Sequence, residues 1–147
     1  MLNIPKDFIE FIELLNKHKV RYLIVGGYAV AYHGYPRSTG DIDILLECSQ
    51  ENASIVKQCL NEFGFGELDI SISDLSTPKQ VIQLGYPPLR IDLITSIDGL
   101  VFQQAWKQRV CVDIQDMTIN FISRKDLLAN KKATGRARDI ADIEELT

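Results

Sequence analysis

The sequence predicts an α+β fold with mixed α/β character, formed by a single domain that spans residues 1–147. Three observations lead to this class. Apolar residues recur at helical spacing near the N-terminus, short runs of β-forming residues alternate with helical segments through the centre, and two further helical segments follow. A chain of 147 residues has the usual size of one domain and is long enough to bury a sizeable core.

The first half of the chain predicts helices and strands that alternate around a pair of glycines. Phe8, Phe11, Ile12 and Leu15 are spaced as on one face of a helix, and Pro5 suits its first turn. In order, the expected elements are a helix over 5–18, a buried strand over 20–25, a break at Gly26-Gly27, a short helix over 28–33 ended by Gly34, a loop over 36–40, a strand over 41–46 and a helix over 51–63 closed by Gly64.

The second half predicts more strands and two final helices. Ser123, with Asp126 three residues on, is a capping-box-like helix start, and Ile140, Ile143 and Leu146 are spaced to face inward from a last helix. In order, the expected elements are a strand over 68–72, strands over 81–84 and 89–94 joined by a turn with Pro87 and Pro88, a helix over 102–108, a hairpin over 110–114 and 118–122, a helix over 123–132 with a break at Gly135, and the last helix.

Composition and charge exclude several classes of protein. The formal net charge is −4, which argues against a sequence-blind nucleic-acid coat protein because such a protein needs a broad basic face. Three widely spaced cysteines, Cys48, Cys59 and Cys111, predict neither a disulfide framework nor a zinc knuckle. The N-terminus lacks the pattern of a signal peptide, and no apolar run has membrane-spanning length. We therefore expect a cytoplasmic protein with no membrane partner.

The segment from Gly26 to Asp43 carries the richest chemistry. Side chains alternate across a strand, so Asp41 and Asp43 point to one side and Ile42 to the other. Two carboxylates at that spacing repel each other, and a divalent cation turns the repulsion into a binding site. Oxygen-only ligands favour Mg²⁺, whose coordination is completed by water and substrate phosphates.

Two further features complete a predicted site for phosphate chemistry. Gly26-Gly27, between a strand and a helix start, allows the backbone to approach a ligand closely and to present N–H groups to phosphate oxygens. A third carboxylate on a neighbouring strand would complete a two-metal centre, and Asp92 is the best candidate. Asp69 and Asp98 compete with it, but both are nearer to loops.

These residues resemble the DNA polymerase β-type nucleotidyltransferase superfamily. More narrowly, the chain resembles the minimal bacterial nucleotidyltransferases related to the AbiEii-type abortive-infection toxins. The resemblance covers nearly the whole chain, and the order of its parts is its strength. Those parts are the run Gly34-Tyr35-Pro36-Arg37-Ser38-Thr39-Gly40-Asp41-Ile42-Asp43, then Asp92, the segment Leu127 to Lys131, and Arg138-Asp139-Ile140-Ala141-Asp142.

The resemblance implies a nucleotidyltransferase-type fold, with a central mixed β-sheet flanked by helices and two C-terminal helices. It implies two Mg²⁺ ions as cofactors and a nucleoside triphosphate (NTP) as substrate. Catalysis and metal binding fall to Asp41, Asp43 and Asp92, and Asp92 also becomes a candidate acceptor for the proton of the attacking hydroxyl. The nucleotide-binding residues would be Gly26, Gly27, Arg37, Thr39 and Lys131. Tyr28 departs from the pattern, because many superfamily members have serine there.

Several residues allow more than one interpretation. His33 is a candidate base or metal ligand, but packing or hydrogen bonding near a helix end is the simpler role. Arg37 would either steady phosphate charge or bridge Asp41 or Asp43 without metal. Asp139 and Asp142 lie three apart on one helical face and would position Arg136, Arg138 or Lys132. Arg124 and Lys125 fit a solvated helix face, and three tyrosines could pack in the core or stack on a base: Tyr28, Tyr32 and Tyr35.

Three functions remain open from the sequence. The first is an enzyme that moves a nucleoside monophosphate (NMP) onto an RNA 3′ end, a protein hydroxyl or a small molecule, with release of pyrophosphate. The second is the toxin of a toxin–antitoxin or abortive-infection system, which would have an antitoxin as partner. The third is a catalytically degenerate fold that binds nucleotide as a regulatory module. The preferred NTP, the acceptor and the oligomeric state are not encoded in any recognisable motif.

Overall fold

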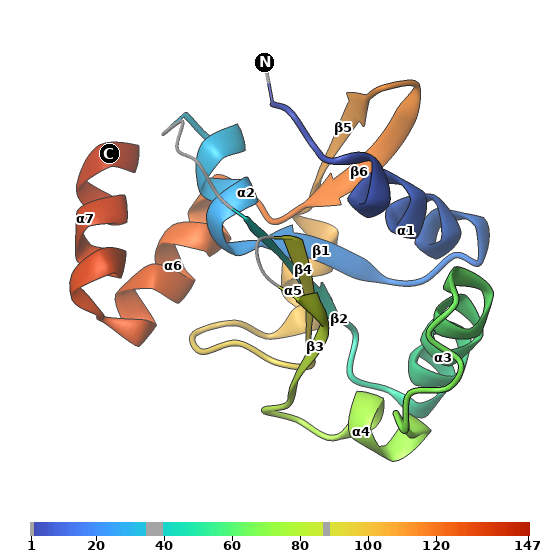
Figure 1. Cartoon of the computed structure of the whole chain (residues 1–147). Helices are drawn as coiled ribbons and strands as arrows, with labels where there is room; N and C mark the ends of the chain where they lie inside the picture. Colours follow the sequence, from blue (N-terminus) through green and yellow to red (C-terminus); the bar gives the residue numbers. More distant parts are fainter. Residues whose placement is uncertain (1, 35–39, 87–88) are drawn as a thin grey trace.

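The central feature of the computed structural model, which describes residues 2–34, 40–86 and 89–147, is one mixed sheet. The strand order across the sheet is β3-β4-β2-β1-β6-β5 (Figure 1). β2 runs parallel to β4 and antiparallel to β1, while β1 runs parallel to β6. The strands are β1 (Tyr22–Val25), β2 (Asp41–Leu46), β3 (Val81–Tyr86), β4 (Leu89–Ile94), β5 (Val110–Ile114) and β6 (Met117–Phe121).

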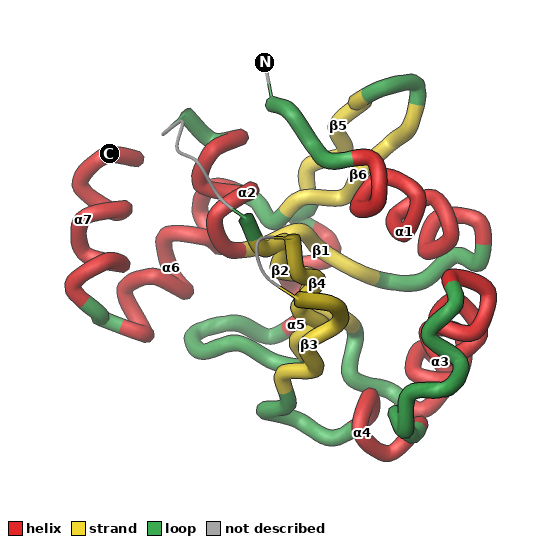
Figure 2. The backbone as a smooth tube through the Cα atoms, viewed as in Figure 1, coloured by secondary structure: helices red, strands yellow, loops and turns green. Residues whose placement is uncertain are grey.

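Helices flank this sheet and pack against it to form the hydrophobic core. In Figures 1 and 2, α1 and α3 lie to one side of the central strands, and the C-terminal pair α6 and α7 lies to the other. The helices are α1 (Lys6–Lys17), α2 (Gly26–Tyr32), α3 (Gln50–Phe63), α4 (Ile72–Ser76), α5 (Phe102–Lys107), α6 (Arg124–Thr134) and α7 (Ala137–Leu146). The predicted fold class, a mixed sheet with flanking helices and two C-terminal helices, is therefore confirmed.

The buried faces follow from the apolar patterns of the sequence. The apolar stripe of α1, including Phe11, Ile12 and Leu15, is fully buried, and all of β1 is buried. Burying each such side chain contributes roughly 1.5–3 kcal/mol to stability. In β2, Ile42 and Ile44 are buried, whereas Asp41 and Asp43 are partly exposed. The two isoleucines of the strand therefore face the core, and its two aspartates lie on the opposite face.

One predicted strand, over residues 68–72, is wrong. Residues 68–71 are not in a strand, and α4 begins at Ile72. Ser71 and Asp74 form a reciprocal capping box at its start, with the Ser71 hydroxyl accepting from Asp74 N at 3.0 Å and Asp74 accepting from Ser71 N at 2.9 Å. This local cap satisfies backbone groups that a strand would have left for a neighbouring strand. The short alternation of apolar and polar residues over 68–72 was too weak to predict a strand reliably, because the capping box favours a helix start at the same place.

The inward face of the last helix also differs from the prediction. Ile140 is 53% exposed, while Asp139, Asp142 and Leu146 are buried. Ile143 is half-buried. Hydrophobic spacing failed here because the buried carboxylates are held by cations of α6 and of the α6–α7 loop, as described below, and a paired charge can be buried.

The β5–β6 hairpin turns through two residues, Gln115 and Asp116. Ile114 pairs with Met117, so β6 begins one residue before its predicted start. Both turn residues have positive φ, 51° and 64°, which is the backbone of a type I′ turn. The other predicted elements agree with the structure to within two residues at most of their ends, and the predicted turn at Pro87 and Pro88 lies outside the described residues. Among the described helices, none has the length and apolarity needed to cross a membrane.

Candidate active site

Three aspartates lie together on the face of the sheet that looks toward α6 and α7. In the parallel β2–β4 pair, Asp43 lies beside Asp92, and Asp41 lies beside Arg90. Asp41, Asp43, Arg90 and Asp92 line one cleft of about 480 Å³. The structure therefore brings together the three acids singled out in the sequence. Of the competing acids, Asp69 is an exposed loop residue, and Asp98 lines a neighbouring cleft.

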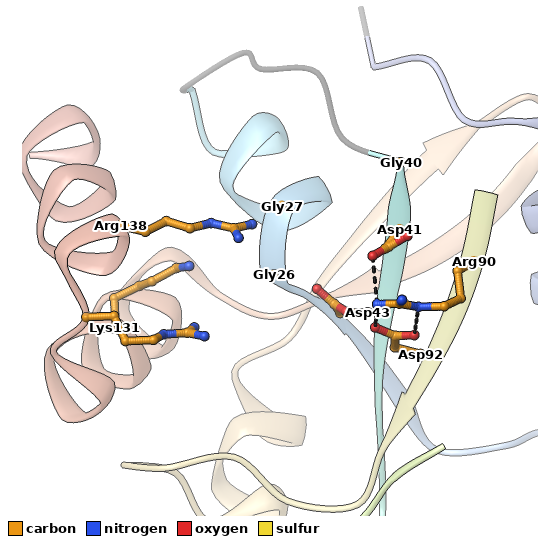
Figure 3. Close-up of a pocket in the computed structure, with 10 residues that line it drawn as sticks. Gly26, Gly27, Gly40, Asp41, Asp43, Arg90, Asp92, Lys131 and Arg138 are labelled. Carbon is orange, nitrogen blue, oxygen red and sulfur yellow. Dashed lines mark hydrogen bonds and ion pairs between the residues drawn. The ribbon is translucent and has the colours of Figure 1, made fainter. Parts of the chain in front are cut away.

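Arg90 is a member of this group that the sequence reasoning missed. Its guanidinium donates to Asp92 from Nε (2.7 Å) and Nη2 (3.0 Å), and to Asp41 from Nη2 (2.9 Å), as Figure 3 shows. The signal was present, because residues two apart on a strand share a face, and Arg90 stands two before Asp92. A cation thus lies between two carboxylates. Within the described part of the chain, no three acidic, His or Cys side chains converge as a ready-made metal cluster.

The surroundings of Asp43 are unfavourable to its negative charge. Burial raises its pKa to about 6, and the neighbouring charges of Asp92 and Asp41 add to the rise, while Arg138 acts against it. Asp43 is therefore held where its negative charge is costly. A carboxylate in that position gains strongly from a nearby cation.

The glycine pair lies against Asp43. Gly26 has a φ of +66°, and a Cβ placed on it would stand 2.0 Å from Asp43 Oδ2. Gly26 is thus required both by its backbone conformation and by the space that the carboxylate occupies. Gly26 and Gly27 both line the cleft. The helix α2 begins at Gly26 itself, two residues earlier than predicted.

A basic wall faces the aspartates across the cleft. It consists of Lys131 from α6, Arg136 from the α6–α7 loop and Arg138 from α7. In Figure 3, Lys131 and Arg138 extend from the helical pair toward Gly26, Gly27 and the acids. The sequence singled out Lys131 as a phosphate ligand, and it placed Arg136 and Arg138 in a basic stretch that could either bind triphosphate or form a solvated helix face. Arg124 and Lys125, expected to be solvated, are exposed and are not among the residues that line the cleft.

Two buried carboxylates hold Lys131 and Arg136 of the basic wall in place. Lys131 Nζ lies 3.2 Å from Asp139 Oδ1 and 3.1 Å from Asp142 Oδ2, and its side chain is buried. Arg136 Nε donates to Asp139 Oδ2 at 2.7 Å. Burial by itself raises the pKa of Asp139, but hydrogen bonds from Arg136, Thr134 and Lys131 outweigh it and hold that pKa well below its usual range. Asp139 and Asp142 were expected to position Arg136, Arg138 or Lys132. In the structure, the cations that they contact are Lys131 and Arg136.

Other residues singled out in the sequence have structural contacts. His33 donates from Nε2 to the carbonyl oxygen of Ile122 at 2.8 Å, which ties the end of α2 to the end of β6. Tyr28 is buried and packs edge-on against Phe8. Burial raises the pKa of Tyr28, and the charge of Asp41 adds to the rise. The predicted nucleotide ligands Arg37 and Thr39, together with Tyr35, lie outside the described residues.

An acidic row faced by a basic wall beside a glycine pair has charges that match those of a metal-bound phosphate ligand. The family model for nucleotidyltransferases of unknown function (DUF6036) matches residues 6–147, and the chain belongs to this family. No curated protein has significant sequence similarity to the chain. The narrower relationship to AbiEii-type toxins is not part of this match.

Solved structures share the fold at low sequence identity. The lincosamide antibiotic adenylyltransferase LnuA, solved with lincomycin bound, has a TM-score of 0.64 and 21% identity, over 99% of this chain and 98% of that one. A protein of Thermotoga maritima described as a candidate nucleotidyltransferase has a TM-score of 0.62 and 17% identity, over 93% and 88%. An antigenic nucleotidyltransferase-like protein of Paracoccidioides brasiliensis has a TM-score of 0.54 and 18% identity, over 95% and 74%.

Proposed function

We propose that the protein is a Mg²⁺-dependent nucleotidyltransferase that transfers an NMP from an NTP to an acceptor hydroxyl and releases pyrophosphate. The observation that carries this proposal is the opposition of charges across one cleft. Asp41, Asp43 and Asp92 stand on the sheet, and Lys131, Arg136 and Arg138 face them. A metal–triphosphate substrate has the complementary arrangement of charge, because its metal ions would bind the aspartates and its phosphate oxygens would bind the basic side chains.

The acidic row fits a divalent cation. It offers only oxygen ligands, which suits Mg²⁺. Arg90 already places a positive charge between Asp41 and Asp92. Burial raises the pKa of Asp43, and the charges of Asp92 and Asp41 add to that rise, so a nearby cation would stabilise its carboxylate. Asp41, Asp43 and Asp92 would hold the ions, and Arg90 would have to release Asp41 and Asp92 to make room. When bound, the metal would neutralise charge on the reacting phosphate.

The chain's own residues would divide the remaining work. The acceptor oxygen forms a bond to the α-phosphorus, the bond from that phosphorus to the bridging oxygen breaks, and pyrophosphate leaves with the bonding electrons. Asp92 would take the proton of the hydroxyl. Lys131, Arg136 and Arg138 would bind the β- and γ-phosphates and stabilise the charge that builds up there. Gly26 and Gly27 would leave room for the phosphates beside Asp43.

The class of acceptor is a finer proposal. An RNA 3′ end, a protein hydroxyl and a small molecule all carry a suitable hydroxyl. The fold shared along nearly the whole chain with an antibiotic adenylyltransferase supports a small-molecule acceptor. A toxin role with an antitoxin partner uses the same chemistry, and growth arrest on expression, relieved by Asp43→Asn, would support it.

The test is transfer of label from NTPs. The pure protein is incubated with each α-³²P-labelled NTP and Mg²⁺, together with total RNA, cell lysate or a panel of hydroxylated small molecules. Label on one acceptor class, lost in Asp43→Asn and kept in Asp69→Asn, is the expected result. Asp69 is the matched control because it is an exposed acid outside the cleft. A wild-type protein that neither transfers label nor binds Mg²⁺-NTP would contradict the proposal, whereas Mg²⁺-NTP binding without transfer to any acceptor would favour the degenerate regulatory module.

A further inference from the structure

A second cleft, of about 580 Å³, adjoins the first and has different chemistry. The two clefts share four lining residues, namely Gly26, Asp43, Lys131 and Arg136. The first is lined by glycines and charged side chains. The second has an apolar wall formed by Val25, Val81, Ile94 and Ile97. Its volume lies within the range of small-molecule sites, which combine apolar walls with a few polar groups.

The strand register places the second cleft at one end of the aspartate row. Arg90, Asp92 and Ile94 alternate along β4 and share a face, and Asp43 pairs with Asp92. Along this face of β4, Asp92 is therefore flanked by Arg90 on one side and by Ile94 on the other. A phosphorus atom that reacts at the acids has charged surroundings toward Arg90 and apolar surroundings toward Ile94.

The position of the basic side chains decides which part of the substrates the second cleft suits. In-line displacement places the acceptor and the leaving pyrophosphate on opposite sides of the reacting phosphorus. Lys131 and Arg136, assigned above to the pyrophosphate, line both clefts, so the second cleft lies on the pyrophosphate's side. The acceptor must approach from elsewhere. The nucleoside, in contrast, is joined to the same phosphates and needs a site beside them.

We propose that the second cleft binds the nucleoside of the NTP, an inference that rests on the proposed function. The base lies against the apolar side chains of Val81, Ile94 and Ile97. Ser96, Asp98 and Asn130 also line this cleft and offer polar groups to the ribose hydroxyls and the base edge. A flat heterocycle with apolar faces and hydrogen-bonding edges matches such a lining.

The wall of this cleft is fixed before ligand arrives. The Ser96 hydroxyl accepts from Lys79 N at 2.8 Å, and Asn130 Nδ2 donates to the Asp98 carbonyl at 2.9 Å. Gly99 packs so closely on α6 that a Cβ there would stand 2.8 Å from the Ala133 Cβ. These contacts join the loop after β4 both to the start of β3 and to α6. A preformed wall reduces the entropy cost of binding a base.

The experiment compares four nucleoside triphosphates with tripolyphosphate, which lacks the nucleoside. Binding of Mg²⁺-ATP, -GTP, -CTP and -UTP and of Mg²⁺-tripolyphosphate is measured by calorimetry for the wild type and for Val81→Trp. Val81 lies on an edge strand that tolerates an aromatic residue, and its indole would fill the apolar part of the cleft. Val101→Trp is the matched control, because both valines are 58% exposed and Val101 lines neither cleft.

We expect Val81→Trp to weaken binding of the best NTP at least tenfold and to leave tripolyphosphate binding unchanged, while Val101→Trp alters neither. NMR of the methyl-labelled wild type should show contacts from base protons to Ile94 and Ile97. Unchanged NTP affinity in Val81→Trp, or base contacts confined to other methyl groups, would overturn the assignment of the nucleoside while leaving the proposed function intact. A wild type that binds neither Mg²⁺-NTP nor tripolyphosphate would instead contradict the proposed function itself.

Discussion

Gly26 lies against the carboxylate of Asp43, with no room for a side chain between them. A Cβ added to Gly26 would stand only 2.0 Å from Asp43 Oδ2, which is far below van der Waals contact. The glycine that follows β1 therefore leaves the space that a carboxylate on the neighbouring strand occupies. Gly26 belongs to the phosphate-binding part of the proposed site and Asp43 to the metal-binding part, so the two parts adjoin at this pair of residues.

Gly26→Ala should abolish transfer by displacing Asp43. We expect a loss of at least 100-fold in NMP transfer, together with a stability loss of roughly 1–2 kcal/mol from a non-glycine residue at positive φ. Gly64→Ala is the control, since Gly64 also has positive φ (+100°) but nothing lies within 4 Å of its Cβ position. It should lose stability without losing transfer. Wild-type activity in Gly26→Ala would show that Asp43 need not stay where it is.

Asp43→Asn should stabilise the metal-free protein at neutral pH while abolishing transfer. The pKa of Asp43 is raised from 3.8 to about 6, so the folded state holds the proton more tightly than the unfolded state does. The resulting cost is absent below pH 3.8 and is fully present above about pH 6. Urea denaturation without divalent ions should show a gain of about 1–3 kcal/mol at pH 7.5 and almost none near pH 4. An equal gain at both pH values would point to a cause other than charge.

Arg90→Gln should strengthen divalent-cation binding to the nucleotide-free protein. Arg90 pairs with both Asp41 and Asp92, so it competes with any ion for the same oxygens. Removing this competitor should tighten Mn²⁺ binding, followed by electron paramagnetic resonance, by about three- to tenfold. Arg124→Gln, which removes an exposed arginine outside the cleft, should leave it unchanged. Weaker Mn²⁺ binding in Arg90→Gln would mean that the arginine supports the ion.

Lys131→Met should destabilise the protein more than the double variant Lys131→Met/Asp142→Asn. The single change leaves the buried Asp139 and Asp142 without their shared cation, which costs about 3–5 kcal/mol. The double change removes one of the two charges and should recover part of that loss. Chemical denaturation measures both variants and the single variant Asp142→Asn, and tripolyphosphate binding should be weakened in both variants that lack Lys131. Additive effects would show that Lys131 and Asp142 do not interact.

Local patterns along the chain predicted most of the fold. The strand with Asp41 and Asp43 was predicted with both ends correct, because alternation and the flanking glycine are both local signals. Asp92 was recognisable as a lone acid in an apolar strand. What was missed depends on contacts between distant segments. The pairing of Arg90 with Asp41 requires the parallel β2–β4 register, which the sequence does not display.

The basic wall shows the same limit at the C-terminal helices. Lys131 is eight residues from Asp139, and the two meet only because α6 and α7 fold back on each other. That ion pair turns the carboxylates of α7 inward and leaves Ile140 in solvent, against its hydrophobic spacing. Arg136 and Arg138 lie close to the inward-facing Asp139 in the sequence, and both line the cleft. Whether Arg37 and Thr39 join them remains a prediction from the sequence.

The two-residue turn of the β5–β6 hairpin offers a route to a more robust protein for these experiments. Gln115 and Asp116 both have positive φ, a backbone that Asn-Gly adopts at lower cost, by about 1 kcal/mol. The hairpin is at the end of the sheet opposite β3, and neither residue lines either cleft. Replacing the pair with Asn-Gly would give a parent sequence with spare stability. Damaging substitutions in the cleft could then be compared in a chain that still folds.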